Sequence, residues 1–182
     1  MDRTWPRFTA VSLESRRLLL EPLRVAHAEE AAVVFNDERL HTYMGASPAT
    51  FDQLQARFRR QTLGHSADRS EDWLNWMVRD RESGGIVGTV QSTVYHSGEN
   101  YDGVHLVAEV AWVVATPFQG RGVATESATA MTDWLRKNGV DVVIAHIHRD
   151  NQPSIGVARN LGLHRTDIIF NGELRWTSPS PS

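Results

Sequence analysis

The sequence predicts one domain of the mixed α/β class, with a central mixed β-sheet flanked by helices. Three observations support this fold class. Strand-like and helix-like segments alternate, residues 105–114 form a run that is apolar on both faces, and a helical segment joins this run to another β-rich run. A strand that is apolar on both faces is typical of the centre of a covered sheet, and strands joined through a helix pair in parallel.

The length and composition fit a single domain. The chain has 182 residues, of which 41% are hydrophobic, which is enough for one sizeable core. We expect a flexible lead over residues 1–12, the domain over 13–177 and a disordered, Ser/Pro-rich tail over 178–182. Because neither a secretory leader nor a membrane-length apolar run is evident, we expect a cytoplasmic protein with no membrane partner.

Composition also excludes several kinds of site. The chain has no cysteine, which excludes disulfides, thiol nucleophiles and cysteine-bound zinc. Its net charge of -3 argues against a broad nucleic-acid-binding surface, so we expect no nucleic-acid partner. His146 and His148 would share one face of a strand, but no third ligand is evident, which favours a packed pair over a metal site. We therefore expect no metal.

Hydrophobic spacing and turn residues place the elements in order. The predicted strands cover residues 16–23, 72–80, 86–95, 105–114, 140–148, 163–170 and 173–177, and the predicted helices cover 25–37, 50–63, 123–137 and 151–162. Pro22 stops the first strand, and the helix after it ends near Asn36. Thr50 and Gln53 form a capping box that opens the second helix.

Turn residues define the remaining elements. A Ser-Gly-Gly turn joins strands 72–80 and 86–95 in a hairpin, and a polar loop over 97–103 follows. Gly139 lies close to the C-terminal cap of helix 123–137, and Pro153 lies in the first turn of the last helix. The pair 171–172, Asn-Gly, favours positive φ and joins the last two strands in a hairpin.

A glycine-containing loop lies between the apolar run and helix 123–137. Backbone N–H groups at a helix N-terminus lack partners and carry partial positive charge, so they bind phosphate where glycines let the ligand approach. Arg121 adds a cation between Gly120 and Gly122. We therefore expect a phosphate or pyrophosphate cradle over residues 119–125, with a plain strand–helix turn as the alternative.

Three phosphate-binding patterns compete at this loop. A P-loop needs Gly-Lys-Ser/Thr at the helix start, where this chain has Gly122-Val123-Ala124. A dinucleotide fingerprint needs a third glycine, where Thr125 stands, and it normally opens its domain, whereas about 115 residues come first here. The third pattern, Gln/Arg-x-x-Gly-x-Gly/Ala, is met in full from Gln119 to Ala124.

With that third pattern the chain resembles the GNAT acetyltransferase superfamily. A second match is the family's Asn-x-x-Ser…Ala…Gly segment, carried here by Asn151, Ser154, Ala158 and Gly162. Leu163 replaces the usual Phe that follows. Residues 108–128, which include Glu109, also resemble the ribosomal-protein N-terminal acetyltransferase branch, approximately so at the end, where Ser127 precedes Ala128. The resemblance is strong over 105–165, and over the rest mainly the order of elements agrees.

The resemblance implies the GNAT fold, in which two parallel strands of the mixed sheet splay apart and admit acetyl-CoA as cosubstrate. Those strands would end near Val114 and His148. Backbone groups of the first strand would pair with the pantetheine arm, loop amides would hold the pyrophosphate, and an asparagine would bond the pantetheine. The implied binding residues are Val113, Val114, Gln119, Gly120, Arg121, Gly122, Val123, Ala124, Thr125, Asn151 and Ser154.

The resemblance also implies three catalytic contributions. Glu109 would act through water as the base that deprotonates the amine, because burial in an apolar strand would raise its pKa toward neutrality. A salt-bridged structural role and an anchor for the substrate amine are its alternatives. The backbone N–H of Val113 would stabilise the oxyanion. Ser154 would protonate the leaving thiolate, with a first-turn serine bonding the backbone as its alternative.

The implied function is acetyl transfer to a primary amine by direct attack in a ternary complex. A protein N-terminus is the acceptor expected from the branch, and a small amine (antibiotic, polyamine or amino acid) is the alternative. A non-catalytic acyl-CoA-binding module and a nicotinamide-dependent oxidoreductase remain as other classes, the latter disfavoured by Thr125. Arg57, Arg59 and Arg60 form a basic patch that faces solvent or the substrate. A homodimer is compatible with the resemblance.

Overall fold

The computed structural model describes residues 8–42, 47–97 and 106–179. Several predicted segments lie outside the described residues. They are residues 1–7 of the lead, residues 98–103 of the polar loop, His105 at the start of the central strand, and residues 180–182 of the tail.

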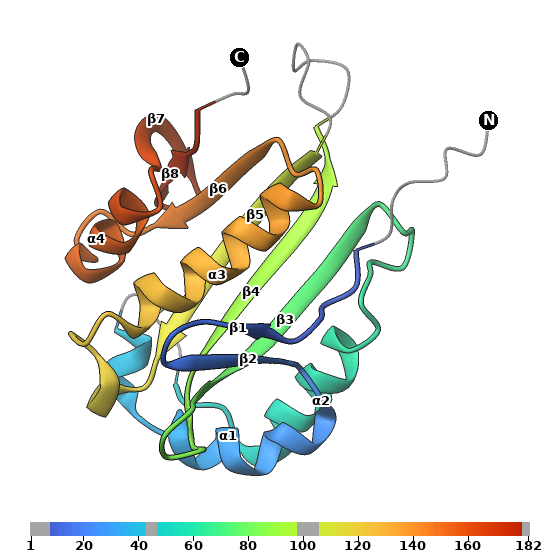
Figure 1. The fold of residues 1–182 in the computed structure, drawn as a ribbon, viewed down its shortest axis with the longest axis vertical. Helices are drawn as coiled ribbons and strands as arrows, with labels where there is room; N and C mark the ends of the chain where they lie inside the picture. Colours follow the sequence, from blue (N-terminus) through green and yellow to red (C-terminus); the bar gives the residue numbers. More distant parts are fainter. Residues whose placement is uncertain (1–7, 43–46, 98–105, 180–182) are drawn as a thin grey trace.

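Eight strands form one mixed sheet in the order β1-β2-β3-β4-β5-β6-β8-β7 (Figure 1). The strands are β1 (Leu13–Glu14), β2 (Leu18–Pro22), β3 (Glu71–Asp80), β4 (Ile86–His96), β5 (Leu106–Val114), β6 (Val142–Ile147), β7 (His164–Phe170) and β8 (Glu173–Thr177). All neighbouring strands run antiparallel except β5 and β6, which are parallel, as predicted for strands joined through a helix.

Helices connect the strands and cover both faces of the sheet. In the described chain they are the 3-10 turns η1 (Val25–His27), η2 (Glu38–His41) and η3 (Thr116–Phe118), and the α-helices α1 (Ala28–Val34), α2 (Phe51–Gln61), α3 (Val123–Lys137) and α4 (Gln152–Asn160). None of these helices is both long enough and apolar enough to cross a membrane.

Most predicted elements are confirmed. Helix α3 has the predicted bounds, and Gly139 after it has a φ of +96°. The capping box of α2 is present, because Thr50 Oγ1 accepts from the Gln53 N–H and Gln53 Oε1 accepts from the Thr50 N–H. Two details differ. The helix predicted over 25–37 begins as η1 and α1 ends at Val34, and β1 is too short to give a periodic pattern.

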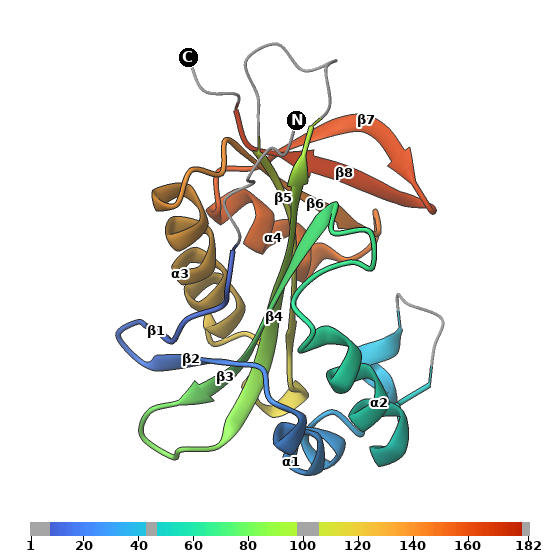
Figure 2. The ribbon, with the colours of Figure 1, turned by 90° about the vertical axis from the view of Figure 1, so that its right-hand side faces the viewer.

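The molecule has three layers, with the sheet in the middle (Figure 2). Helices α1 and α2 lie on one face, where Phe58 of α2 shares a buried cluster with Met77 of β3. Helices α3 and α4 lie on the other face, over the larger core. There Trp76 is fully buried and meets Trp134 of α3 edge to face, with 6.0 Å between ring centroids.

Strand β5 is paired differently on its two sides. Its antiparallel pairing with β4 covers the whole strand, from Leu106 to Val114. Its parallel pairing with β6 covers only Val107–Val142, Ala108–Val143 and Glu109–Ile144. Beyond Glu109 the two strands separate, so the β6-side edge of β5 has no strand partner among the described residues. The sheet therefore opens at its centre.

The domain makes contacts slightly beyond the boundaries expected from sequence. Phe8, inside the predicted lead, is buried in the main core, and its N–H donates to Asp72 Oδ2 at 2.9 Å. Ser178, the first residue of the predicted tail, is also buried. Its N–H donates to the Val143 carbonyl, and its Oγ accepts from the Val143 N–H. Both residues continue the packing of the sheet, so a boundary drawn from composition alone is too narrow.

Glu126 in the first turn of α3 joins that helix to the connection between β1 and β2. Its carboxylate accepts from Ser15 Oγ at 2.7 Å, from the Arg17 N–H at 2.8 Å and from Arg17 Nε at 2.7 Å. Burial raises the pKa of Glu126, but the hydrogen bonds from Ser15 and Arg17 outweigh it, and the pKa lies below its ordinary value of 4.5.

Replacing Glu126 with Gln should lower the free energy of unfolding at neutral pH by about 1 to 2 kcal/mol, because the charge-assisted bonds weaken. A depressed folded pKa stabilises the protein above the unfolded pKa of 4.5, and this contribution is lost as the pH falls through the folded value. Urea unfolding at neutral pH and at about pH 3 checks this. The difference between Glu126→Gln and wild type should shrink in acid, and an undiminished difference would contradict the assignment.

Gly88 of β4 allows close approach to the end of β5. A Cβ at this position would lie 2.7 Å from the Val113 carbonyl oxygen, whereas a Cβ at Gly85 would meet only Ser83 Oγ at 3.7 Å. Gly88→Ala should therefore displace β5 near Val113 and destabilise the fold by about 1 to 3 kcal/mol. Gly85→Ala is the matched control, and its urea midpoint of unfolding should equal that of the wild type. Equal midpoints for both variants would show that β5 tolerates the shift.

Candidate functional site

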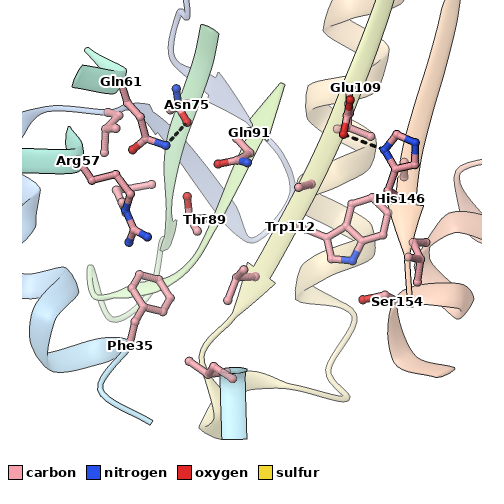
Figure 3. Close-up of a pocket in the computed structure, with 18 of the residues that line it drawn as sticks. Phe35, Arg57, Gln61, Asn75, Thr89, Gln91, Glu109, Trp112, His146 and Ser154 are labelled. Atoms are coloured by element: carbon pink, nitrogen blue, oxygen red, sulfur yellow. Dashed lines mark hydrogen bonds and ion pairs between the residues drawn. The ribbon is translucent and has the colours of Figure 1, made fainter. Parts of the chain in front are cut away.

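A cavity of about 530 Å³ lies where β5 and β6 separate, on the face of the sheet that α1 and α2 cover (Figure 3). Residues of η2, α2, β3, β4, β5, β6, α4 and β8 line it. Those that carry polar groups are Arg57, Gln61, Asn75, Thr89, Gln91, Glu109, Trp112, His146, Asn151, Ser154 and Glu173. The cavity thus joins the gap in the sheet to the space beneath α2.

Strand register sets the floor of the cavity. Asn75, Gln91 and Ala111 are opposite one another on β3, β4 and β5, and the next row along brings Thr89 opposite Val113. Residues opposite one another in neighbouring strands point to the same face of a sheet. A polar surface therefore extends across β3 and β4, and the small or apolar Ala111 and Val113 continue it to the separated edge of β5.

A chain of hydrogen bonds crosses the sheet beside the gap. Arg175 Nε on β8 donates to His146 Nε2 on β6 at 3.2 Å, and His146 Nδ1 lies 2.9 Å from Glu109 Oε1 on β5. Because a guanidinium only donates, Nε2 must accept, which puts the imidazole proton on Nδ1. The Nδ1–H of His146 then donates to Glu109. This arrangement orients the Glu109 carboxylate through Nδ1, while Nε2 accepts from Arg175.

Glu109 differs from its predicted environment. The expectation of a buried carboxylate is wrong, because 42% of the Glu109 side chain is exposed, while 6% of the His146 side chain is. The central strand buries its other face, and the register turns Glu109 toward the cavity. Its carboxylate is therefore reachable from the cavity, and its partner rather than its own burial fixes its position.

A second carboxylate lines the same end of the cavity. Burial raises the pKa of the Glu173 carboxyl above its ordinary value, and the charge of Glu109 raises it further. Glu173 begins β8, next to the hairpin turn at Asn171, whose φ of +50° is the positive value predicted there. No local signal in the sequence identifies Glu173 as a site residue, because only the pairing of β8 with β6 brings it there.

Asn151 and Ser154 lie on the opposite side of the gap from β5. The Asn151 side chain is the N-terminal cap of α4 and accepts from the Ser154 N–H at 3.2 Å. Ser154 lies in the first turn of α4, and Figure 3 shows its hydroxyl directed toward the gap near Trp112. The backbone role considered for Ser154 is present through its N–H, and its hydroxyl lines the cavity.

The backbone of β5 presents alternate residues to the gap. The Ala115 N–H donates to the Val87 carbonyl of β4, and the Leu106 carbonyl accepts from the Asp141 N–H just before β6. Since antiparallel pairing alternates along a strand, odd-numbered residues of β5 direct their backbone groups to β4 and even-numbered residues direct theirs to β6. The predicted use of the Val113 N–H as an oxyanion donor is therefore wrong. The backbone N–H and C=O groups of Trp112 and Val114 face the gap instead.

The glycine loop follows β5 at the end of the gap. Gly120 and Gly122 have φ values of +71° and +76°, and Gly122 occupies the N-cap position of α3. No side chain caps α3 within the described residues, whereas Thr50 caps α2 and Asn151 caps α4. The first N–H groups of a helix have no partner within the helix, so α3 presents donors and a partial positive charge at the loop.

Neighbouring residues hold the loop in place. Gln119 Nε2 donates to the Val114 carbonyl at 2.9 Å, and Arg17 Nη2 donates to the Arg121 carbonyl at 3.0 Å. The Arg121 guanidinium lies over the Phe118 ring, 5.9 Å from its centroid. Of the predicted site residues, Glu109, Val113, Asn151 and Ser154 line the cavity, whereas Val114 and residues 119–125 stand at its edge or beyond it.

Other residues reach the cavity without a local signal in the sequence. Trp112 and His146 belong to strands, and only the register turns them toward the gap. Arg57 of the predicted basic patch also lines the cavity. No group of three or more His, Cys, Asp or Glu side chains suited to a metal ion occurs among residues 8–42, 47–97 and 106–179.

Comparisons with known proteins agree with this geometry. Residues 17–164 match the family described as acetyltransferase (GNAT) domain. A mycothiol acetyltransferase of Arthrobacter sp. (strain FB24) is 30% identical over 131 residues, which are 69% of this chain and 39% of that protein. The chain thus spans well under half of the length of this curated relative.

Solved structures share the fold over nearly the whole chain. A protein of Bordetella pertussis assigned to the GnaT family of acetyltransferases has a TM-score of 0.71 and 27% identity, covering 93% of this chain and 99% of that one. A ribosomal L7/L12 α-N-protein acetyltransferase in complex with coenzyme A has a TM-score of 0.69 and 17% identity, covering 92% and 97%. This second likeness concerns the fold alone. The match over residues 17–164, together with the opened sheet and the glycine loop, establishes that the chain belongs to the GNAT acetyltransferase family.

Proposed function

We propose that this protein transfers the acetyl group of acetyl-CoA to a primary amine by direct attack in a ternary complex. One observation carries the proposal. The unpaired edge of β5, the uncapped N-terminus of α3 and the carboxylate of Glu109 meet around one opening in the sheet. A thioester arm, a pyrophosphate and an amine each need one of these three features.

The pantetheine arm of acetyl-CoA would lie in the gap between β5 and β6. Even-numbered residues of β5 direct backbone groups to this gap, so Trp112 and Val114 would pair with the arm as an added strand would. Gln119 already occupies the Val114 carbonyl, which leaves the N–H groups of Trp112 and Val114 as the donors for an oxyanion. Asn151 and Ser154 would contact the arm from α4.

The pyrophosphate would bind the amides of residues 120–125, with Arg121 and the backbone of Val123 and Ala124 nearby. Glu126 does not oppose an anion there, because Arg17 bonds its carboxylate and neutralises its charge. The positive φ values at Gly120 and Gly122 favour glycine, since other residues are strained in this conformation.

Acetyl transfer needs a neutral amine, a stabilised oxyanion and a proton for the leaving sulfur. We infer that Glu109, held by His146, takes the proton from the attacking nitrogen through water. The nitrogen forms the new bond to the acetyl carbon, and the C–S bond then breaks as the oxyanion collapses. Ser154 would give a proton to the thiolate and be reprotonated from solvent.

Two candidate acceptors are proposed. A protein N-terminus is the acceptor that we propose from the resemblance to ribosomal-protein acetyltransferases. The sequence similarity to mycothiol acetyltransferases favours a small amine as the second candidate. Both acceptors present a primary amine to the same carboxylate, and a turnover panel that contains N-terminal peptides and small amines separates them.

Gly122→Ala should weaken the binding of CoA, because the added methyl strains a backbone at φ +76° and approaches Arg17 Nη2 at 3.5 Å. Gly139→Ala is the matched control, since Gly139 has a φ of +96° at the other end of the same helix and nothing lies near its Cβ. Calorimetric titration with CoA should give at least about a tenfold weaker Kd for Gly122→Ala and an unchanged Kd for Gly139→Ala. Equal CoA affinities for the two variants would mean that the loop only connects β5 to α3 and does not bind the phosphates.

Glu109→Gln should lower kcat for acetyl transfer about 100-fold or more while leaving the Kd for acetyl-CoA unchanged, because the amide keeps the shape but cannot accept the proton. Thiol release with an amine panel measures kcat, and calorimetry measures the Kd. Unchanged turnover would remove Glu109 as the base. Acetyl-CoA binding without turnover by the wild type on any amine would instead favour a non-catalytic acyl-CoA-binding module.

A further inference from the structure

We propose that the acceptor amine carries an anionic group several bonds from its nitrogen, and that Arg57 of α2 binds this group. The inference rests on the acetyl transfer proposed above and names its substrate class. Three observations carry it: the separation of charge within the cavity, the lack of a carboxylate partner for Arg57 among the described residues, and the wide, partly polar surface between Arg57 and Glu109.

The charged side chains that line the cavity are divided between its two sides. Arg57 comes from α2, whereas Glu109 and Glu173 come from β5 and β8, beside the gap. Figure 3 shows Arg57 and Glu109 on opposite sides of the cavity. His146 lies on the acidic side, where its ring is held between Glu109 and Arg175. The cavity therefore complements a molecule with a cationic end and an anionic end.

Arg57 differs from the arginines that support the fold. Arg79 pairs with Glu21 and Glu30, and Arg17 pairs with Glu126. No carboxylate of the described residues forms an ion pair with Arg57, whose guanidinium lies near the Phe58 ring, 6.0 Å from its centroid.

Arg57 lines the cavity and is at the same time exposed to solvent, so a ligand can reach its guanidinium. A guanidinium that has no carboxylate partner among the described residues can hold an anionic ligand, because a carboxylate or phosphate accepts two parallel hydrogen bonds from it.

The surface between the two sides is wide, and it is polar over β3 and β4. Gln61, one turn after Arg57, donates to Asn75 Oδ1 at 3.1 Å, which fixes the end of α2 above β3. Asn75, Gln91 and Ala111 then cross β3, β4 and β5 in register. Two strand spacings separate β3 from β5, which is about 10 Å. An α-amino acid, whose charges are one carbon apart, is too short to reach both sides.

The acceptor class that fits is thus an amine with a remote carboxylate or phosphate. A long ω-amino acid and a peptide with an acidic residue after its free N-terminus share this chemistry.

The test uses matched pairs of each kind of amine. ω-Amino acids of increasing length are compared with their uncharged primary amides, and N-terminal peptides with Glu are compared with the same peptides with Gln. Initial rates of thiol release from acetyl-CoA give kcat/KM for each.

Wild type should prefer the anionic member of a pair by about tenfold or more, with the preference growing with chain length. Arg57→Ala should remove this preference, and Arg57→Glu should reverse it. Arg59→Ala is the control, because Arg59 lies two residues away on α2 and is exposed like Arg57 but does not line the cavity. Thermal unfolding of each variant, with and without acetyl-CoA, checks that the fold and the CoA site are intact.

The outcomes separate this inference from the function on which it rests. Turnover of amines with no preference for an anionic group, or a preference that survives in Arg57→Ala, overturns the role of Arg57 and leaves acetyl transfer standing. Lack of turnover on every amine of the panel counts against both. A preference confined to the peptide pairs identifies a protein N-terminus as the source of the anion, and one confined to the ω-amino acids identifies a small molecule.

Discussion

The limited pairing between β5 and β6 is the constraint on which the site depends. The two parallel strands are in register for three residue pairs and then separate, while β5 stays paired with β4 along its whole length. A central strand thereby gains an open edge, which a folded protein normally avoids because it leaves backbone donors and acceptors without partners. Here the opening lies between β5 and α4, so a ligand rather than another chain can fill it.

Different residues shape the two ends of the gap between β5 and β6. At one end, the N-terminus of α3 has no side-chain cap, and the glycines before it adopt left-handed conformations. Glu126 would repel an anion from this helix start, but Arg17 bonds both its carboxylate and the loop carbonyl at Arg121. The connection between β1 and β2 therefore supports a loop more than a hundred positions later in the chain, and it does so without adding net charge at the proposed phosphate site.

At the other end, the last residue of β5 that pairs with β6 is Glu109 itself. Its position is set by His146 on the neighbouring strand, and the tautomer of His146 is set in turn by Arg175 on the strand after that. Hydrogen-bond chains of this kind fix the orientation of an exposed carboxylate that burial does not hold. Glu109 and the guanidinium of Arg57 on α2 lie on opposite sides of the cavity (Figure 3). The two sides of the cavity therefore carry opposite charges.

The sequence by itself determined the fold class, the bounds of α3, the capping box of α2, the parallel strand–helix–strand unit and the glycine loop. Each of these depends on local patterns, namely periodicity, caps and residues that tolerate positive φ. Only the tertiary structure decided which groups meet in the cavity. The exposure of Glu109, the turn of backbone groups at Val113 away from the gap, and the approach of His146, Glu173 and Arg57 all depend on strand register and on the order of β6, β8 and β7. Register is a relation between distant segments, and shifting it by one residue would reverse which side chains and backbone groups face the site, so no local pattern can specify it.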